Sequence, residues 1–434
     1  MRIRTIAAAS VTAGLVASVL AATPGQAAPD SEQPRGISFD RFDDRGDFRA
    51  GQFDDVYVQG NRLALRLRTE DTIRYRDPFG DKRKRRYDVG SWTSPVVKLG
   101  FDASEAVPSW NAKTPTGTWV ETRFRGRHDD GTWTKWYVMG RWTSGMDFER
   151  GDIHRTSVGD QGDDDGTVWT DTFAANDGKE VDAYQLRVRL MRPAGKWWVR
   201  SPQVSAIGAM ASEDGGEPGA TSERYLDRAV ELDVPQFSQN IHKGEYPDFG
   251  GGGQVWCSPT SSTMLQYYWG RRYQVRPWEL RDIEAPNGDP QVDYAAMHTW
   301  DYEYDGAGNW PYNAAYVSTF GLDTFVTRLR SLAEIERFIE AGIPVAVSIA
   351  FTEEEMPEAG YGTDGHLMVV RGFTDEGDPI LNDPASNTNE GVRNVYTRDN
   401  FERAWQSASG GIVYVYHPKR VDLPDNVSGA SQNW

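Results

Sequence analysis

A single cysteine, Cys257, is the feature that most restricts what this chain of 434 residues can become. One thiol cannot form an intramolecular disulfide, and it cannot build a thiolate-rich zinc site, which needs several sulfur ligands. Cys257 follows a run of glycines, 250–253, and precedes a segment whose apolar residues recur at helical spacing, with Pro259 suited to a first turn. The pattern predicts a helix that begins beside the thiol.

Two interpretations of Cys257 follow from this position. A thiol at a helix N-terminus lies at the positive end of the helix dipole, which lowers its pKa and favours the nucleophilic thiolate. The glycines before it would let the backbone approach a substrate closely. The alternative is a buried structural cysteine, because free cysteines are among the most buried residues. This stretch alone favours neither interpretation, so the rest of the chain has to decide.

The N-terminus has the pattern of a secretory signal peptide, residues 1–27. Arg2 and Arg4 precede an apolar run, 6–22, and small residues offer a cleavage site before Ala28. No later segment is apolar enough to cross a bilayer. We therefore expect a secreted or cell-surface protein, in a compartment where an unpaired cysteine is a liability unless its reactivity is used.

The overall charge separates the classes of partner. The net charge of −17 argues against nucleic acid, whose phosphates would be repelled, and suits a soluble exported protein. The glycine run lacks the lysine and hydroxyl residue that end a phosphate-binding P-loop. No metal constellation stands out, so we expect neither a cofactor nor a metal.

The segment 35–210 is predicted to be an antiparallel β-sandwich. Apolar and polar residues alternate over 184–190 and over 120–125, as in strands with one buried face. Asp130 and Gly131 form a hairpin turn signal. Short strands separated by Gly, Asp and Pro turns are typical of a sandwich.

Three features of this segment have a functional and a structural interpretation. A tryptophan-rich core is favoured over a sugar-stacking platform for one set of residues: Trp92, Trp110, Trp119, Trp133, Trp136 and Trp142. A solvated turn is favoured over a calcium site for the acidic loop of Asp160 and 163–165, which lacks the spacing of a helix-loop-helix site. The basic run 82–86 is interpreted as a solvated loop that would contact an anionic wall polymer only weakly.

A short linker, 211–222, is small, acidic and rich in Gly and Pro, and it separates the sandwich from a second domain, 223–420. In that domain Ser331 and Glu334 form a capping box before an amphipathic helix. A buried strand is predicted over 344–351 and further strands follow. Helices come first and antiparallel strands later, which is the α+β pattern.

A base and an orienting group for Cys257 can be chosen from the second domain. Of the six histidines, His366 alone follows a Gly-rich loop and opens an apolar strand, so its ring can face a cleft. Asp383 lies on the adjoining strand of the predicted hairpin. Each has a structural alternative, a buried hydrogen-bonded ring for His366 and a turn cap for Asp383. The order Cys, His, Asp is more specific than any one member, and it matches the needs of a cysteine nucleophile.

The second domain resembles the papain-like cysteine peptidases of the bacteriocin-processing type. The matching motifs are VPQFSQN (234–240), WCSPTSSTMLQYYWG (256–270), AGIPVAVSI (341–349), GHLMVVRGF (365–373) and LNDPAS (381–386). The resemblance implies a papain-like fold, with Cys257 as nucleophile, His366 as general base and Asp383 as orienting group. It also implies a glutamine in the oxyanion hole, for which Gln239 and Gln254 are the candidates.

One residue departs from the family pattern. Ser258 stands where the family usually has glycine after the cysteine, and it would narrow the site or cap the helix. The expected activity is hydrolysis of peptide bonds through a thioester acyl-enzyme. The alternatives are an amidase or transpeptidase acting on cell-wall peptides, and a catalytically silent papain-like module that binds a surface. The expected partners are a protein or peptide substrate and, through the sandwich, cell wall or polysaccharide.

Overall fold

The computed structural model describes residues 35–214 and 219–434. The predicted signal peptide lies outside these residues, and so does part of the predicted linker. The described chain combines three antiparallel sheets with six α-helices, so the predicted α+β class is confirmed. No helix in the described ranges combines the length and the apolar character that a membrane crossing requires.

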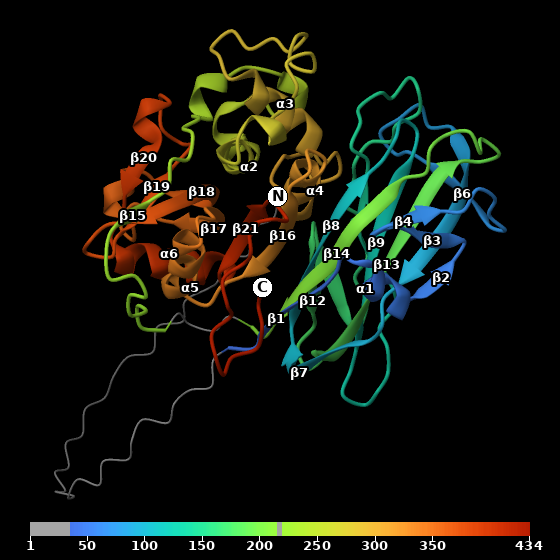
Figure 1. Ribbon diagram of the computed structural model, residues 1–434, viewed down its shortest axis with the longest axis horizontal. Helices are drawn as coiled ribbons and strands as arrows, with labels where there is room; N and C mark the ends of the chain where they lie inside the picture. Colours follow the sequence, from blue (N-terminus) through green and yellow to red (C-terminus); the bar gives the residue numbers. More distant parts are fainter. Residues whose placement is uncertain (1–34, 215–218) are drawn as a thin grey trace, which may run out of the picture. The chain divides into compact units, whose positions relative to one another are not determined.

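The N-terminal part forms two sheets that face each other (Figure 1). The first sheet contains β11 (Gly166–Trp169), β12 (Thr172–Ala175), β8 (Glu105–Lys113), β14 (Gln203–Ser212), β4 (Arg62–Leu65) and β3 (Val56–Gln59), with β1 (Ile37–Phe42) paired to β14. The second contains β10 (Tyr137–Trp142), β9 (Trp119–Arg127), β13 (Val181–Pro193), β6 (Lys84–Thr93) and β2 (Gln52–Asp54), with β5 (Thr72–Arg76) paired to β6 and β7 (Val97–Ala103) to β13. A short helix, α1 (Arg45–Ala50), was not expected from the sequence.

Most of the predicted tryptophan core lies between or beside these sheets. Four of the six residues are at most 1% exposed: Trp92, Trp110, Trp119 and Trp142. Trp133 and Trp136 are half-buried, and the Arg125 guanidinium lies 4.4 Å and 4.5 Å from their ring centres. The core interpretation therefore holds for four residues, whereas the other two form a cation–π stack at the surface of the second sheet.

The C-terminal part is built on a third sheet. Its strands are β16 (Asp323–Arg328), β21 (Ile412–His417), β17 (Val345–Phe351), β18 (Thr363–Phe373), β19 (Pro379–Asn382) and β20 (Arg393–Val395), with β15 (Val230–Glu231) paired to β18. The helices are α2 (Cys257–Tyr268), α3 (Pro290–Thr299), α4 (Trp310–Ser318), α5 (Leu332–Glu340) and α6 (Arg398–Ser409). Short 3₁₀ turns are η1 (Asn240–His242), η2 (Pro247–Phe249), η3 (Gly253–Val255), η4 (Arg271–Tyr273), η5 (Pro357–Ala359) and η6 (Glu390–Val392).

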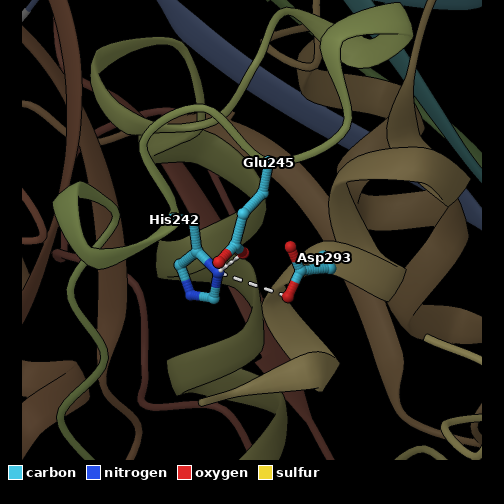
Figure 2. A group of neighbouring side chains, drawn as sticks. All are labelled: His242, Glu245 and Asp293. Carbon is cyan, nitrogen blue, oxygen red and sulfur yellow. Dashed lines mark hydrogen bonds and ion pairs between the residues drawn. The ribbon is translucent and has the colours of Figure 1, made fainter. Parts of the chain in front are cut away.

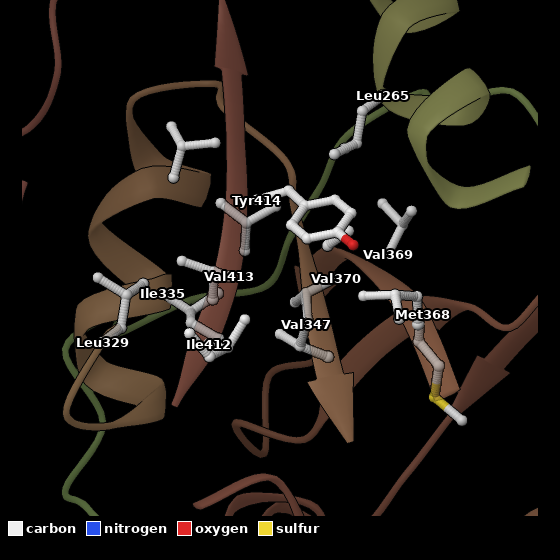
Figure 3. Packing of buried hydrophobic residues seen from close by; sticks show 14 of the residues in the cluster. Leu265, Leu329, Ile335, Val347, Met368, Val369, Val370, Ile412, Val413 and Tyr414 are labelled. Carbon is white, nitrogen blue, oxygen red and sulfur yellow. The ribbon is translucent and has the colours of Figure 1, made fainter. Parts of the chain in front are cut away.

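Aliphatic side chains from this sheet and its helices form one core (Figure 3). Val347 on β17 and Val369 on β18 are fully buried there, together with Leu265 of α2 and Ile335 of α5. The β-branched residues suit strands with two covered faces. This core fixes α2, which carries the cysteine, against β18, which carries His366.

The α5 helix begins where predicted, but its cap differs from the expected capping box. Ser331 makes no side-chain capping hydrogen bond. The Glu334 carboxylate instead accepts a hydrogen bond from the Arg330 backbone N–H at 2.7 Å and lies 3.1 Å from the Arg330 guanidinium. The ion pair with Arg330 draws the carboxylate away from the reciprocal contact that the motif predicts.

The two cores share the helix α4. Tyr312 and Ala315 on α4 pack into the sandwich core, whereas Val107 on β8 packs into the core of the third sheet. A sandwich residue also contacts the first residue of α4: the Asp171 carboxylate accepts a hydrogen bond of 2.7 Å from the Trp310 backbone N–H. The helix α4 therefore contributes apolar side chains to both cores.

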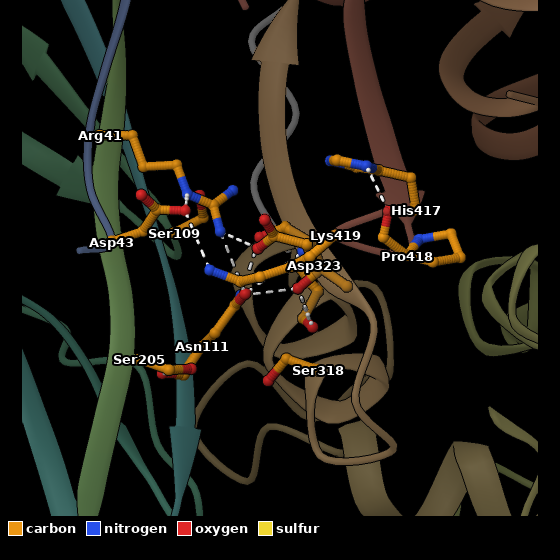
Figure 4. A network of polar contacts seen from close by, with 12 residues as sticks. Arg41, Asp43, Ser109, Asn111, Ser205, Ser318, Asp323, His417, Pro418 and Lys419 are labelled. Atoms are coloured by element: carbon orange, nitrogen blue, oxygen red, sulfur yellow. Dashed lines mark hydrogen bonds and ion pairs between the residues drawn. The ribbon is translucent and has the colours of Figure 1, made fainter. Parts of the chain in front are cut away.

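Polar contacts join the same two parts (Figure 4). On β8, the Asn111 side-chain amide donates to the backbone oxygen of Thr324, on β16, at 2.8 Å and is 2.7 Å from its hydroxyl. Arg41 forms an ion pair with Asp323, the first residue of β16. These contacts between buried and half-buried polar groups hold the edge of the third sheet on the sandwich.

Candidate active site

The helix that carries the cysteine is buried on all sides, although it is rich in serine and threonine. Its hydroxyl groups have partners inside the protein: Ser261 donates to the Leu367 backbone oxygen at 2.9 Å, and Ser262 to the Asn313 side-chain oxygen at 3.1 Å. A buried hydroxyl is tolerated when it is hydrogen-bonded. Cys257 is the first residue of this helix, as predicted, and is 9% exposed.

The glycine run before the cysteine has a steric reason to be glycine. All residues of the run 250–253 have positive φ, which side chains rarely adopt. A Cβ on Gly252 would lie 1.9 Å from the backbone oxygen of His242. The run is therefore pressed against the chain around His242, and this close packing sets the path by which the backbone enters α2.

The structure brings His366 and Asp383 together in the hairpin that the sequence predicts. His366 lies within β18 opposite Ile349 of β17, rather than at the head of the strand as expected. Asp383 directly follows β19, which pairs with β18. The His366 Nε2 atom is 2.8 Å from Asp383 Oδ1, and both residues are 3% exposed.

Two tyrosines that the sequence analysis missed complete the surroundings of Asp383. Tyr361 and Tyr396 each donate a hydroxyl hydrogen bond of 2.8 Å to Asp383 Oδ2. The Ala385 backbone N–H donates to Oδ1 at 2.9 Å. Burial raises the pKa of Asp383, but His366 and these donors outweigh it, so the pKa is lowered and the carboxylate is ionised.

The cysteine and histidine shift each other's protonation. Burial raises the pKa of the Cys257 thiol, yet the hydrogen bond and charge of His366, helped by the Leu367 and Ser258 backbone N–H groups, lower it overall. Burial lowers the pKa of His366, but Asp383 and Cys257 raise it to about 10. Both shifts favour a thiolate beside an imidazolium, which is the reactive state of a cysteine nucleophile.

The structure separates the two glutamine candidates. Gln239 is 2% exposed, its backbone N–H donates to the Pro384 oxygen at 2.9 Å, and its side-chain oxygen is buried without a hydrogen-bond partner among the described residues. Gln254 lies exposed in η3. Gln239 is therefore the candidate that is held next to the Asp383 turn, and Gln254 has no comparable restraint.

Ser258, which departs from the family pattern, points away from the helix end. Its Oγ atom is 2.9 Å from the Tyr414 hydroxyl on β21, and both residues are at most 1% exposed. It makes no capping hydrogen bond to the start of α2. The extra side chain is accommodated in the core, so it does not replace any of the groups beside the thiol.

The acidic loop of the sandwich uses its carboxylates within the protein. Asp163 lies 3.0 Å from the Lys135 ammonium and accepts a 2.5 Å hydrogen bond from the Tyr137 hydroxyl. Asp165 lies 3.3 Å from the His128 ring. Protein donors and cations thus contact these groups, which favours the interpretation of a solvated turn.

The basic run 82–86 was expected to be a loop, but most of it is strand. Residues 84–86 open β6 and pair with β5. Alternate side chains of a strand stand on opposite faces, so a strand can carry basic residues on one face. Arg83 and Arg85 help to line a pocket of about 390 Å³ in the sandwich. This pocket is lined by sandwich residues and is separate from Cys257.

Other aromatic residues that the sequence did not single out are exposed. They are Trp169, Trp197, Trp198 and Trp278, each between 59% and 65% exposed. Trp197 and Trp198 lie between β13 and β14 with ring centres 6.0 Å apart.

Comparison with known proteins assigns both parts of the chain. Residues 38–212 match the peptidase C39 N-terminal domain, and residues 231–413 match the peptidase C39-like family. No curated protein matches the chain.

Two solved structures show limited similarity. One is described as a C39-like peptidase from Bacillus anthracis, with 17% identity, a TM-score of 0.28, and coverage of 46% of this chain and 100% of that one. The other contains carbohydrate-binding modules of the β-sandwich superfamily, with 8% identity, a TM-score of 0.15, and coverage of 41% of this chain and 56% of that one. The two matched family domains follow one another in the same order as the two parts of the structure. The chain belongs to the C39-like, papain-like peptidases, with a β-rich peptidase C39 N-terminal domain ahead of the peptidase domain.

Proposed function

We propose that this protein is a secreted cysteine peptidase that hydrolyses peptide bonds through Cys257, His366 and Asp383. Family membership supports a cysteine-peptidase type of function. The observation that carries the proposal is the position of His366, whose ring contacts the Asp383 carboxylate at 2.8 Å and lowers the pKa of the Cys257 thiol. This is the chain of contacts that a cysteine nucleophile requires.

The proposed reaction is acyl transfer. The Cys257 thiolate attacks the carbonyl carbon of a peptide bond, and the His366 imidazolium gives its proton to the leaving amine as the carbon–nitrogen bond breaks. The neutral imidazole then takes a proton from water, which attacks the thioester and releases the acid and the free thiol. Asp383 holds the ring and stabilises its charged form throughout.

The oxyanion of the tetrahedral intermediate needs hydrogen-bond donors. The Cys257 backbone N–H is at the first position of a helix, where no intrahelical partner exists. We assign the second donor to the Gln239 side-chain amide, because that residue is buried beside the Asp383 turn and its side chain makes no hydrogen bond to the described residues. Removing such a donor typically lowers kcat by about 100-fold to 1000-fold.

Secretion is part of the proposal and rests on the N-terminal sequence. An exported protein with one unpaired thiol fits an enzyme that uses the thiol. The substrate class proposed is protein or peptide. An amidase or transpeptidase acting on cell-wall peptides would use the same three side chains, so the two are distinguished by products rather than by the site.

The test is cleavage profiling of a protein mixture and of isolated peptidoglycan by the wild type, Cys257→Ala and His366→Ala. His298→Ala is the matched control, since the His298 ring is stacked on Tyr294, with ring centres 3.9 Å apart, and makes its hydrogen bond to the Tyr294 backbone oxygen. The wild type and the control should release new peptide termini, and the two site variants should not. Full cleavage by Cys257→Ala would end the proposal, whereas release from peptidoglycan alone would replace the peptidase by the amidase.

A further inference from the structure

A second cluster of titratable side chains lies against the loop that leads to Cys257. His242 ends η1, Glu245 follows it by one turn of chain, and Asp293 comes from α3 (Figure 2). Their exposed fractions are 0%, 8% and 0%. The His242 Nδ1 atom lies 2.8 Å from Glu245 Oε2 and 3.2 Å from Asp293 Oδ2. The three side chains point toward one shared position.

The protein's own hydrogen bonds leave this cluster unbalanced. One Nδ1–H can donate to only one carboxylate, and the 2.8 Å contact gives it to Glu245. Both carboxylate oxygens of Asp293 are then buried without a hydrogen-bond partner among the described residues. Two carboxylates against one imidazole leave a net negative charge even if His242 is protonated. An uncompensated buried carboxylate is strongly unfavourable.

We propose that His242, Glu245 and Asp293 bind a divalent transition-metal ion of the Zn²⁺ type. One ligand atom from each residue lies within 4.8 Å of the others. Zinc bonds of 2.0–2.1 Å in a tetrahedral site place neighbouring ligand atoms roughly 3.3 Å apart, close to the separations seen here. A dication also cancels the two carboxylate charges when the imidazole is neutral.

The donor set decides between kinds of ion. Calcium and magnesium prefer sites made of oxygen ligands, whereas an imidazole nitrogen with carboxylates suits zinc or a related transition metal. Glu245 is also oriented from outside the cluster, because the Asn287 side-chain amide donates to its other oxygen at 3.0 Å. Such outer hydrogen bonds hold metal ligands in place.

The ion would connect the loop before the cysteine to α3. Gly252 is pressed against the His242 backbone oxygen, and the ring of His242 lies 5.8 Å from that of Trp256, the residue before the thiol. Gln239 stands at the start of the same turn. The ion would hold this loop in position, and its presence does not depend on the proposed peptidase activity.

The experiment uses the full chain, purified without a polyhistidine tag. Its metal content is measured by inductively coupled plasma mass spectrometry. Its melting temperature is measured by thermal unfolding in the presence of EDTA, ZnCl₂ or MnCl₂. The variants are Asp293→Asn and Glu245→Gln. Asp164→Asn, in the exposed acidic loop, is the matched control. Cys257→Ala tests whether zinc binds to the reactive thiol instead.

We expect near-stoichiometric metal in the wild type, in Asp164→Asn and in Cys257→Ala, and a lower melting temperature after EDTA that zinc or manganese restores. Asp293→Asn and Glu245→Gln should bind metal at least about tenfold more weakly, and their melting temperatures should no longer respond to EDTA. If Asp293→Asn does not fold, Glu245→Gln alone provides the test. A wild type without metal and without a thermal response to either ion would overturn the proposal and assign the cluster to a proton shared by the two carboxyl groups. Metal that survives in both ligand variants, or is lost from Cys257→Ala or Asp164→Asn, would overturn it as well.

Discussion

Replacing Asp383 by asparagine removes one charge from the candidate active site while keeping a side chain of the same shape. The asparagine oxygen can still accept from His366 Nε2, and its amide group can donate to the hydroxyls of Tyr361 and Tyr396, which turn to accept. The change therefore tests the charge of Asp383 separately from its role in holding the ring. The effect of the substitution is measured as a change in the reactivity of the Cys257 thiol.

The size of the effect follows from the ion pair. Allowing for delocalised charge, opposite charges about 4 Å apart attract by about 4 kcal/mol at an effective dielectric constant of 20. Because about 1.4 kcal/mol corresponds to a factor of ten in protonation, loss of this charge lowers the population of thiolate with imidazolium by up to about a thousandfold. The asparagine dipole recovers part of it, so we expect a fall of about a hundredfold at neutral pH.

The expected fall in thiolate population agrees with the directions of the pKa shifts of His366 and Cys257. Asp383 is a main cause of the rise in the pKa of His366 to about 10. Without it that pKa falls and the pKa of the thiol rises, since burial is then less opposed. The proton returns to sulfur, and alkylation in the variant should recover only when the solution is alkaline enough to ionise the thiol directly.

The assay is the rate of alkylation by iodoacetamide as a function of pH. Cys257 is the only cysteine, so the loss of free thiol reports on it alone. N-acetylcysteine gives the behaviour of an unperturbed thiol. At neutral pH the wild type should be alkylated well above the rate that the small thiolate fraction of N-acetylcysteine gives. The rate for Asp383→Asn should fall toward the rate for N-acetylcysteine. Equal rates and equal pH profiles for the wild type and Asp383→Asn would refute the electrostatic argument.

Three further changes test the surroundings. Tyr396→Phe removes one donor to the Asp383 carboxylate and should lower the free energy of unfolding by about 1.5–3 kcal/mol, measured in urea; no change would mean that the bond is not formed. Ser258→Gly strands the buried Tyr414 hydroxyl and adds a helical glycine, so stability should fall by roughly 2 kcal/mol while cleavage persists; lost cleavage in a folded variant would give Ser258 a role in the site. Burial raises the pKa of Asp171 from 3.8 to about 7, so the folded state holds an extra proton and its stability falls as pH rises through that interval; Asp171→Asn should flatten this dependence of the melting temperature, and an unaltered profile would contradict it.

The parts of the site that the sequence could predict are those set by local pattern. The helix after Cys257 follows from the spacing of its apolar residues, and the hairpin that joins His366 to Asp383 follows from two short apolar strands with a turn between them. Each of these depends on neighbours within a few residues. Their assembly with the cysteine needed only the order of the elements and a familiar family pattern.

The missing parts arise from contacts between distant segments. Tyr396 reaches Asp383 from the segment after β20, and no periodicity distinguishes it from any other buried tyrosine. The buried cluster escaped notice for the same reason, because Asp293 joins His242 and Glu245 only when α3 packs beside the cysteine helix. The tryptophans show the converse: the predicted sandwich core accounts for a buried residue such as Trp92, but it does not single out an exposed ring such as Trp198.

The helix α4 has a consequence for how the protein comes apart. Its side chains belong to both apolar cores, so detaching α4 would disturb both cores at once. Melting should then proceed as a single event, and a chain cut near residue 215 should give two fragments that remain bound to each other. The sandwich would then be a permanent part of the scaffold that holds the proposed active site, and not a module that can be removed from it.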